Sequence, residues 1–85
     1  MEKEVGKIAA NEALRRFREF QKIDQEELAR ILETYRPQIS LYETGKREMK
    51  SGQIRAICEH YNVSADYLLG LTDEYRPLHG DPDET

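Results

Sequence analysis

The feature that most constrains the fold is a pair of short helical patterns separated by only three residues. The first pattern begins at Asp24 and Glu27, which fit the N-cap and N3 positions of a capping box. The second spans residues 37–44 and is followed by Gly45, which can adopt the left-handed conformation that ends a helix. Residues 33–35 leave room only for a tight turn, so the segment predicts two short helices joined by a three-residue turn. Their inner faces are expected to carry Leu28, Ala29, Leu32, Ile39 and Tyr42.

Three more segments show the apolar spacing of three and four residues that is typical of an amphipathic helix. They are expected at residues 9–21, after an N-cap at Ser51, and between Ser64 and Gly70. The apolar residues of the two longer helices are Ala10, Ala13, Leu14, Phe17 and Phe20, and then Ile54, Ile57, Cys58 and Tyr61. Because no segment alternates with the period of two that marks a strand, the sequence predicts an all-α domain of five helices.

The length of 85 residues allows one domain, which we expect to span residues 9–71. Residues 1–8 form an N-terminal extension that can continue the first helix, although Gly6 disfavours this. Residues 72–85 contain two prolines, a glycine and six charged residues, which indicates a flexible acidic tail.

Several function classes find no support in the sequence. No apolar run approaches the roughly 20 residues that span a bilayer, and residues 1–7 lack the apolar core of a signal peptide, so we expect a cytoplasmic protein without a membrane partner. Cys58 is the single cysteine, and because His60 faces another direction on the same helix, no metal site is expected. No nucleophile, base and oriented partner occur together, so we expect neither enzymatic activity nor a cofactor.

The net charge of −4 argues at first sight against a nucleic-acid partner, but the acidic residues are concentrated near the C-terminus. Residues 1–65 carry 12 basic and 11 acidic residues, whereas residues 66–85 carry one basic and six acidic residues. The globular part is therefore balanced in charge and lacks the clear basic excess of many nucleic-acid-binding domains.

Four stretches occur in a specific order: Leu14, Phe17 and Arg18; QEELA at residues 25–29; ISLYETGKR at residues 39–47; and YNVSADYLLG at residues 61–70. Together they closely resemble the lambda-repressor-like, or XRE, family of helix-turn-helix domains, continuously from about residue 14 to residue 71. The resemblance implies five helices, with the third as the recognition helix in the major groove of double-stranded DNA. It also implies a transcription regulator that commonly binds near-palindromic operators as a homodimer, with half-sites about 10–10.5 base pairs apart.

An ion pair is expected to hold the recognition helix in place. Glu43 falls on the inner side of this helix, where a lone carboxylate would cost several kcal/mol. The resemblance implies Arg18 in the first helix as its partner, with a structural role. The alternative is that the two residues are unrelated surface charges.

At the start of the recognition helix, the resemblance implies residues that reach base edges, and here they are Arg36, Pro37 and Gln38. An arginine can bind guanine, and a glutamine adenine, through two hydrogen bonds each. Pro37 departs from the polar pattern and disfavours a helical conformation at Arg36, so we expect Arg36 as an arm beside a helix that starts one residue late. Alternatively, Pro37 only starts the helix. Gln25, at the start of the second helix, is expected to donate to a phosphate or else to be an ordinary solvated residue.

The rest of the expected interface lies on the exposed face of the recognition helix and on the loop after it. These residues are Ser40, Leu41 and Thr44 on the helix, and Lys46, Arg47 and Lys50 on the loop. Leu41 can contact a thymine methyl group or mark a contact with another protein. The three cations can neutralise phosphates, or they can form an ordinary solvated loop.

Two apolar residues near the end of the domain leave a choice open. Tyr67 and Leu71 can form a small two-fold interface between copies of the chain, or they can cover the first helix within one chain.

The sequence therefore predicts a sequence-specific DNA-binding transcription regulator that acts as a repressor. The alternative is a protein-interaction module, antitoxin-like or anti-regulator, that keeps the fold, binds a regulatory protein partner and has weak or no DNA affinity. Pro37, Leu41 and an acidic tail that can mask the basic loop favour this alternative.

Overall fold

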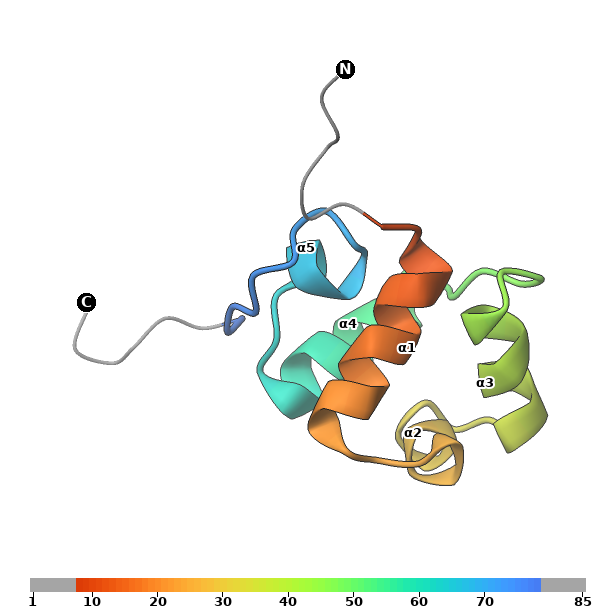
Figure 1. The fold of residues 1–85 in the computed structure, drawn as a ribbon. Coiled ribbons are helices and arrows are strands. Elements are labelled where there is room, and N and C mark those ends of the chain that lie inside the picture. The colour runs from red at the N-terminus through yellow and green to blue at the C-terminus, as the bar shows by residue number, and fades with distance from the viewer. Residues whose placement is uncertain (1–7, 79–85) are drawn as a thin grey trace, which may run out of the picture.

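The computed structural model describes residues 8–78, and these residues form five helices with no strand among them. The helices are α1 (Ala10–Gln21), α2 (Gln25–Ile31), α3 (Arg36–Glu43), α4 (Ser51–Tyr61) and α5 (Ala65–Leu68). In Figure 1, α1 crosses the middle of the molecule, with α3 on one side and α5 on the other. The all-α, five-helix class predicted from the apolar spacing is confirmed.

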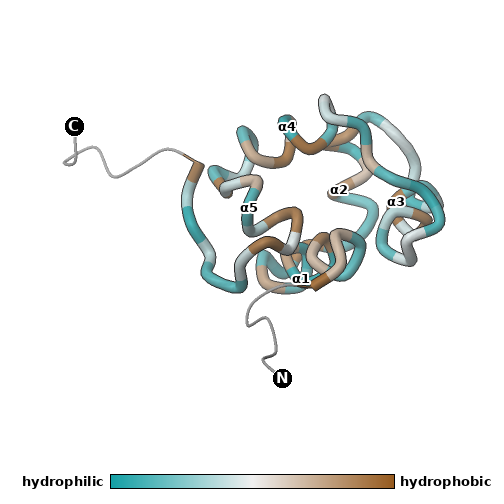
Figure 2. Tube along the Cα trace, turned by 90° about the horizontal axis from the view of Figure 1, so that it is seen from above, coloured by the Kyte–Doolittle hydropathy of each residue, from teal (hydrophilic) through white to brown (hydrophobic). Residues whose placement is uncertain are grey.

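Helix α1 is the central element because its apolar stripe faces both α3 and α5. Ala13, Leu14 and Phe17 on this stripe are at most 1% exposed. The helix ends where Lys22 takes a left-handed conformation with φ of 60° and returns its N–H to the last turn. Figure 2 shows hydrophobic residues recurring at intervals along the helices, as expected where each buries one face.

Helices α2 and α3 pack against each other across the predicted tight turn. Asp24 caps α2 as expected, since its Oδ1 accepts the backbone N–H of Glu27 at 2.8 Å. The Glu27 carboxylate accepts the hydroxyl of Tyr61 in α4 at 3.4 Å, so this side chain links two helices. Glu33 makes the turn with φ of 57°, an uncommon conformation for a residue other than glycine.

Two helix starts differ from the prediction. Helix α3 begins at Arg36, one residue before the predicted start at Pro37. At α4, Lys50 is the N-cap and Ser51 is already helical, because the Gln53 side chain accepts the Lys50 backbone N–H at 2.9 Å and closes the first turn. A glutamine at N3 therefore replaces the expected serine cap.

Gly70 ends the α5 region as predicted, with φ of 85°, after the Ser64 hydroxyl caps this helix by accepting the Tyr67 N–H at 3.3 Å. The Gly70 carbonyl accepts the Ile8 N–H at 3.0 Å, which joins the start of the described chain to the end of α5. A Cβ atom on Gly70 would collide with the Ile8 carbonyl oxygen, so glycine is needed here both for its φ and for space.

The packed chain continues beyond Leu71, where we placed the domain boundary. The ring of Tyr75 lies 5.1 Å from that of Phe20 and 5.0 Å from that of Tyr67, measured between centroids. The Arg76 carbonyl accepts the Ser64 N–H at 2.8 Å. The helicity of residues 1–7 and the flexibility of residues 79–85 stay predictions, because they lie outside the described residues.

Candidate nucleic-acid interface

A buried ion pair fixes the inner side of α3. Arg18 Nε lies 2.6 Å from Glu43 Oε2, and Arg18 Nη2 donates to Glu43 Oε1 at 3.2 Å. The Glu43 side chain is 2% exposed and that of Arg18 is 15% exposed. The hydrogen bond to Glu43 raises the pKa of Arg18 further, against the opposing effect of burial. The expected contact between these two residues is therefore present, and it joins α3 to α1.

Gln25 extends this pair toward the surface. Its Nε2 donates to Glu43 Oε1 at 3.1 Å, and its Oε1 accepts from Arg36 Nη1 at 3.1 Å. The side chains thus form a continuous chain from Arg18 through Glu43 and Gln25 to Arg36. One end is buried and the other is exposed at the start of α3. Because Gln25 and Arg36 are already held by these hydrogen bonds, they would lose less conformational entropy on binding a ligand than two freely moving side chains would.

The expectation that Arg36 lies outside the helix is wrong. Arg36 is the first residue of α3, after Tyr35 in an extended conformation as N-cap. A residue before proline is disfavoured in the helical region but not excluded from it. The helix start is closed by the Gln38 N–H, which donates to the Tyr35 carbonyl at 2.9 Å. Arg36 is therefore held on the helix by this first turn and by Gln25.

The exposed face of α3 is less uniform than the sequence suggested. Arg36, Pro37 and Thr44 are exposed, whereas the other three predicted contact residues are half-buried (Gln38, Ser40 and Leu41). The Thr44 hydroxyl lies within hydrogen-bond distance of the Ser40 and Leu41 carbonyls, at 2.9 and 3.3 Å. Its hydrogen is thus used inside the helix, and a contact from Thr44 to DNA would come from its methyl group or its oxygen lone pair.

The loop after α3 carries three exposed cations, Lys46, Arg47 and Lys50. The N–H groups of Lys46 and Arg47 both donate to the Leu41 carbonyl, at 3.0 and 3.3 Å, so the loop folds back on the end of α3. Among the described residues, none of these cations forms an ion pair. They remain available to a phosphate backbone beside the start of the loop.

Two residues at this site were not singled out in the sequence. Asn11 donates from Nδ2 to the Glu43 carbonyl at 3.2 Å and so ties α1 to the last turn of α3. Tyr35 precedes Arg36 and is 73% exposed, which adds an aromatic ring to the surface at the start of α3. The sequence signal for Tyr35 was its place in the three-residue turn. Asn11 gave no signal, because a polar residue near a helix start is ordinary.

Tyr67 does not offer the dimer contact that was one of its two expected roles. Its side chain is 4% exposed, its ring stacks under the Arg16 guanidinium at 4.1 Å, and it contacts Tyr75. Tyr67 therefore covers α1 within its own chain, which was the other expectation. Leu71 is 57% exposed and remains available for a contact with another chain.

Comparisons with known proteins agree with this arrangement. A family model described as a helix-turn-helix domain matches residues 11–74, and no curated protein sequence matches. A crystal structure of the P22 c2 repressor in complex with a synthetic operator is similar at a TM-score of 0.65 and 27% identity, covering 73% of this chain and 94% of that one. The fold is also similar to a transcriptional regulator from Listeria innocua, at a TM-score of 0.67 and 14% identity, covering 92% of this chain and 70% of that one.

Proposed function

The chain belongs to the helix-turn-helix domain family, of the lambda-repressor-like type, and from this we propose that it binds operator DNA in a sequence-specific manner and represses transcription. The observation that carries the proposal is the series of side-chain hydrogen bonds that links Arg18 to Arg36 through Glu43 and Gln25. It orients an exposed arginine at the start of α3, beside a loop whose three cations form no ion pair within residues 8–78. These two elements supply the two parts of a DNA interface, base readout and phosphate binding.

Base readout is assigned to the first turn of α3, which would lie in the major groove. Arg36 donates to Gln25 through one of its five N–H groups, so four remain for the two acceptors that guanine presents there. The side chain is already held in place, which lowers the entropy cost of binding. Gln38, one position beyond Pro37, is the second candidate for contact with a base edge.

Phosphate contacts are assigned to Lys46, Arg47 and Lys50, with a backbone contact near Gln25. The Gln25 side chain is engaged by Glu43 and Arg36, so the contact proposed for this residue is made by its backbone N–H at the start of α2. Such contacts fix the orientation of the domain on the duplex and do not read sequence. The three loop cations offset the acidic net charge of −4 locally.

A homodimer on a near-palindromic operator completes the proposal. Half-sites about 10–10.5 base pairs apart place the two copies on one side of the duplex. Leu71, which is 57% exposed after α5, is our candidate for the contact between copies.

The test is selection from a randomised duplex pool at two salt concentrations, followed by sequencing. We expect a near-palindromic sequence whose affinity falls steeply with salt, because several phosphates are neutralised. Arg36→Ala should relax specificity at one position and cost about 1–3 kcal/mol. Arg55→Ala is the matched control, since Arg55 is an exposed arginine on α4, outside the proposed interface, and should leave the selected sequence unchanged. The absence of any enrichment at low salt would reject the proposal.

A protein-interaction role is the second candidate, and one observation favours it. Phe20, in the last turn of α1, is 60% exposed and its ring lies 5.1 Å from that of Tyr75, so aromatic surface is open at this end of α1. If the selection enriches no sequence, this aromatic surface is the first place to substitute, with Phe20→Ser as the variant and loss of complex formation with a co-purified protein as the readout.

A further inference from the structure

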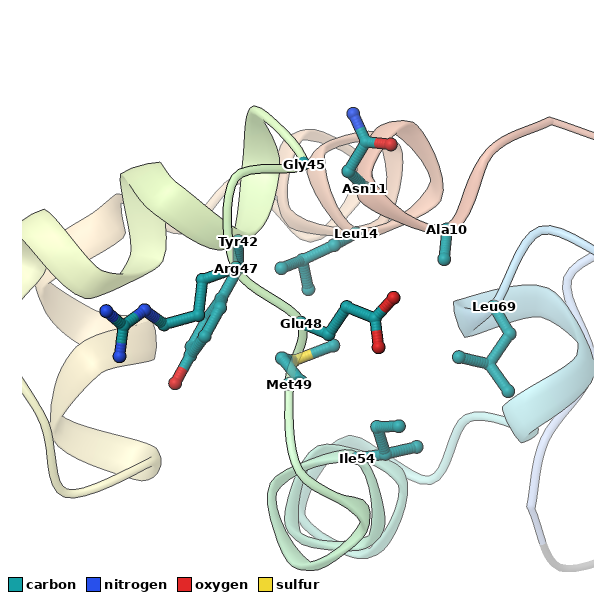
Figure 3. A pocket seen from close by; sticks show the side chains of 10 residues that line it. All are labelled: Ala10, Asn11, Leu14, Tyr42, Gly45, Arg47, Glu48, Met49, Ile54 and Leu69. Carbon is teal, nitrogen blue, oxygen red and sulfur yellow. The ribbon is translucent and has the colours of Figure 1, made fainter.

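A pocket of about 380 Å³ lies between α1, the loop that follows α3, the start of α4 and the end of α5 (Figure 3). Its size falls within the range of about 300–1,000 Å³ that is typical of small-molecule sites. Its apolar and aromatic lining consists of Ala10, Leu14, Tyr42, Met49, Ile54 and Leu69. Arg47 is the only lining residue that we also assign to DNA, and Tyr42 and the loop connect the pocket to α3.

The charged groups at the pocket are arranged asymmetrically. Figure 3 shows the Glu48 carboxylate pointing into the space bounded by Ala10, Leu69 and Ile54. The Arg47 guanidinium lies on the side of Tyr42 and points away from Glu48. Within residues 8–78, Glu48 forms no ion pair and no side-chain hydrogen bond. The Asn11 amide nitrogen is engaged by the Glu43 carbonyl. The charge directed into the pocket is therefore negative.

We propose that this pocket binds a small organic cation, an ammonium group on a short alkyl or aryl body. The ammonium pairs with Glu48 through a charge-assisted hydrogen bond, which is stronger than a neutral one. The apolar body lies against the half-buried Met49, Ile54 and Leu69, where it removes apolar surface from water. Glu48 is exposed, so its carboxylate would repel an anionic ligand, and a neutral ligand would gain no ionic contact with it.

The site has a consequence for DNA binding, and this step rests on the proposed function. Glu48 and Met49 belong to the loop that carries Lys46, Arg47 and Lys50. A bound cation would neutralise the one carboxylate in that loop and would join the loop to α1 and α5. Both effects favour the DNA-bound state, and by linkage DNA would then raise the affinity for the cation by the same factor. The ligand would therefore act as a corepressor.

Ligand binding is tested without DNA, by titrating the full chain with phenethylamine and following backbone amide signals by NMR. We expect saturable shifts at Asn11, Glu48, Met49 and Leu69, and much weaker effects from the matched alcohol 2-phenylethanol and the anion 3-phenylpropionate. Glu48→Gln should weaken phenethylamine binding about tenfold, the effect of losing one charge-assisted hydrogen bond. Glu33→Gln is the control, because Glu33 is an exposed glutamate that does not line the pocket. Equal affinity for the amine and the alcohol, or an unchanged affinity in Glu48→Gln, would overturn the assignment, and so would the absence of saturable shifts.

The effector role is tested separately with the selected operator. Saturating phenethylamine should tighten operator binding several-fold, and Glu48→Gln should tighten it without ligand and abolish the response. An unchanged operator affinity at saturating phenethylamine would reject the corepressor role while leaving the binding site in place. If no operator is found, the proposed function fails, whereas the NMR titration still decides on the site.

Discussion

Replacing Arg18 by methionine tests whether the ion pair with Glu43 holds α3 in place. Arg18→Met keeps most of the aliphatic stem but removes two of the three donors to the Glu43 carboxylate, leaving Gln25 Nε2 at 3.1 Å. Breaking a buried pair by removing one partner costs about 3–5 kcal/mol. Because the Arg18 side chain is 15% exposed and water can approach the site, we expect about 3 kcal/mol, a large share of the stability of a small domain.

The assay is urea unfolding followed by helical circular dichroism, and the control is an exposed pair. Arg55→Met breaks the Arg55–Glu59 pair, whose side chains are 80% and 58% exposed, and should cost about 0.5 kcal/mol or less. The double variant Arg18→Met/Glu43→Leu should recover part of the loss, because no buried carboxylate is left unpaired. A loss of stability in Arg18→Met no larger than in Arg55→Met would refute the reasoning. So would a double variant whose loss equals the sum of the losses in Arg18→Met and Glu43→Leu measured separately.

Three further predictions follow from the packing and the loop. Gly70→Ala should lower the free energy of unfolding by about 2 kcal/mol or more, because alanine at φ of 85° is strained and its Cβ collides with the Ile8 carbonyl. Urea unfolding measures this loss, and a value below about 0.5 kcal/mol would contradict the prediction. Burial and the adjacent Glu27 carboxylate raise the pKa of Tyr61. The folded pKa of Tyr61 therefore lies above the unfolded value of about 10. The contribution of Tyr61 to stability is present below pH about 10 and is lost as pH rises through the folded pKa. Tyr61→Phe should reduce this loss of stability at alkaline pH, which urea unfolding at several pH values measures. Lys46→Ala should reduce the slope of log operator affinity against log salt by about one, with the selected sequence unchanged; an unchanged slope would exclude a phosphate contact.

The helices could be predicted because their apolar periodicity is a local property of the sequence. Asp24, Gly45 and Gly70 each carry a local signal for a helix start or stop, and each was placed correctly. The starts of α3 and α4 were wrong by one residue. There the outcome depended on which hydrogen bond closes the first turn, and Gln53 competes with Ser51 for that role at α4.

The contacts at the candidate site could be predicted only where a family pattern names both partners, as for Arg18 and Glu43. The bond from Gln25 to Arg36 joins two residues whose separate roles were expected, but their contact depends on the crossing of α2 and α3. Residues 72–78 looked like the start of a tail by composition. Tyr75 was the one aromatic residue in that stretch, and it packs on Phe20 and Tyr67. Composition averaged over a segment hides such a single anchor.

The two ends of the described chain differ in how close they lie to α3. Ile8 is held at the end of α5 by its bond to Gly70, but it comes only three residues before Asn11, which bonds the last turn of α3. Leu78 lies beside Cys58 of α4 and Ala65 of α5, and Figure 1 shows this end of the described chain on the side of α1 away from α3. A fluorescent protein, an affinity handle or an activation domain is therefore better fused at the C-terminal end, where the face of α3 stays open. Two such domains could also be joined in tandem by a linker from the end of one to the start of the next. The linker length would then select the distance between the two sites.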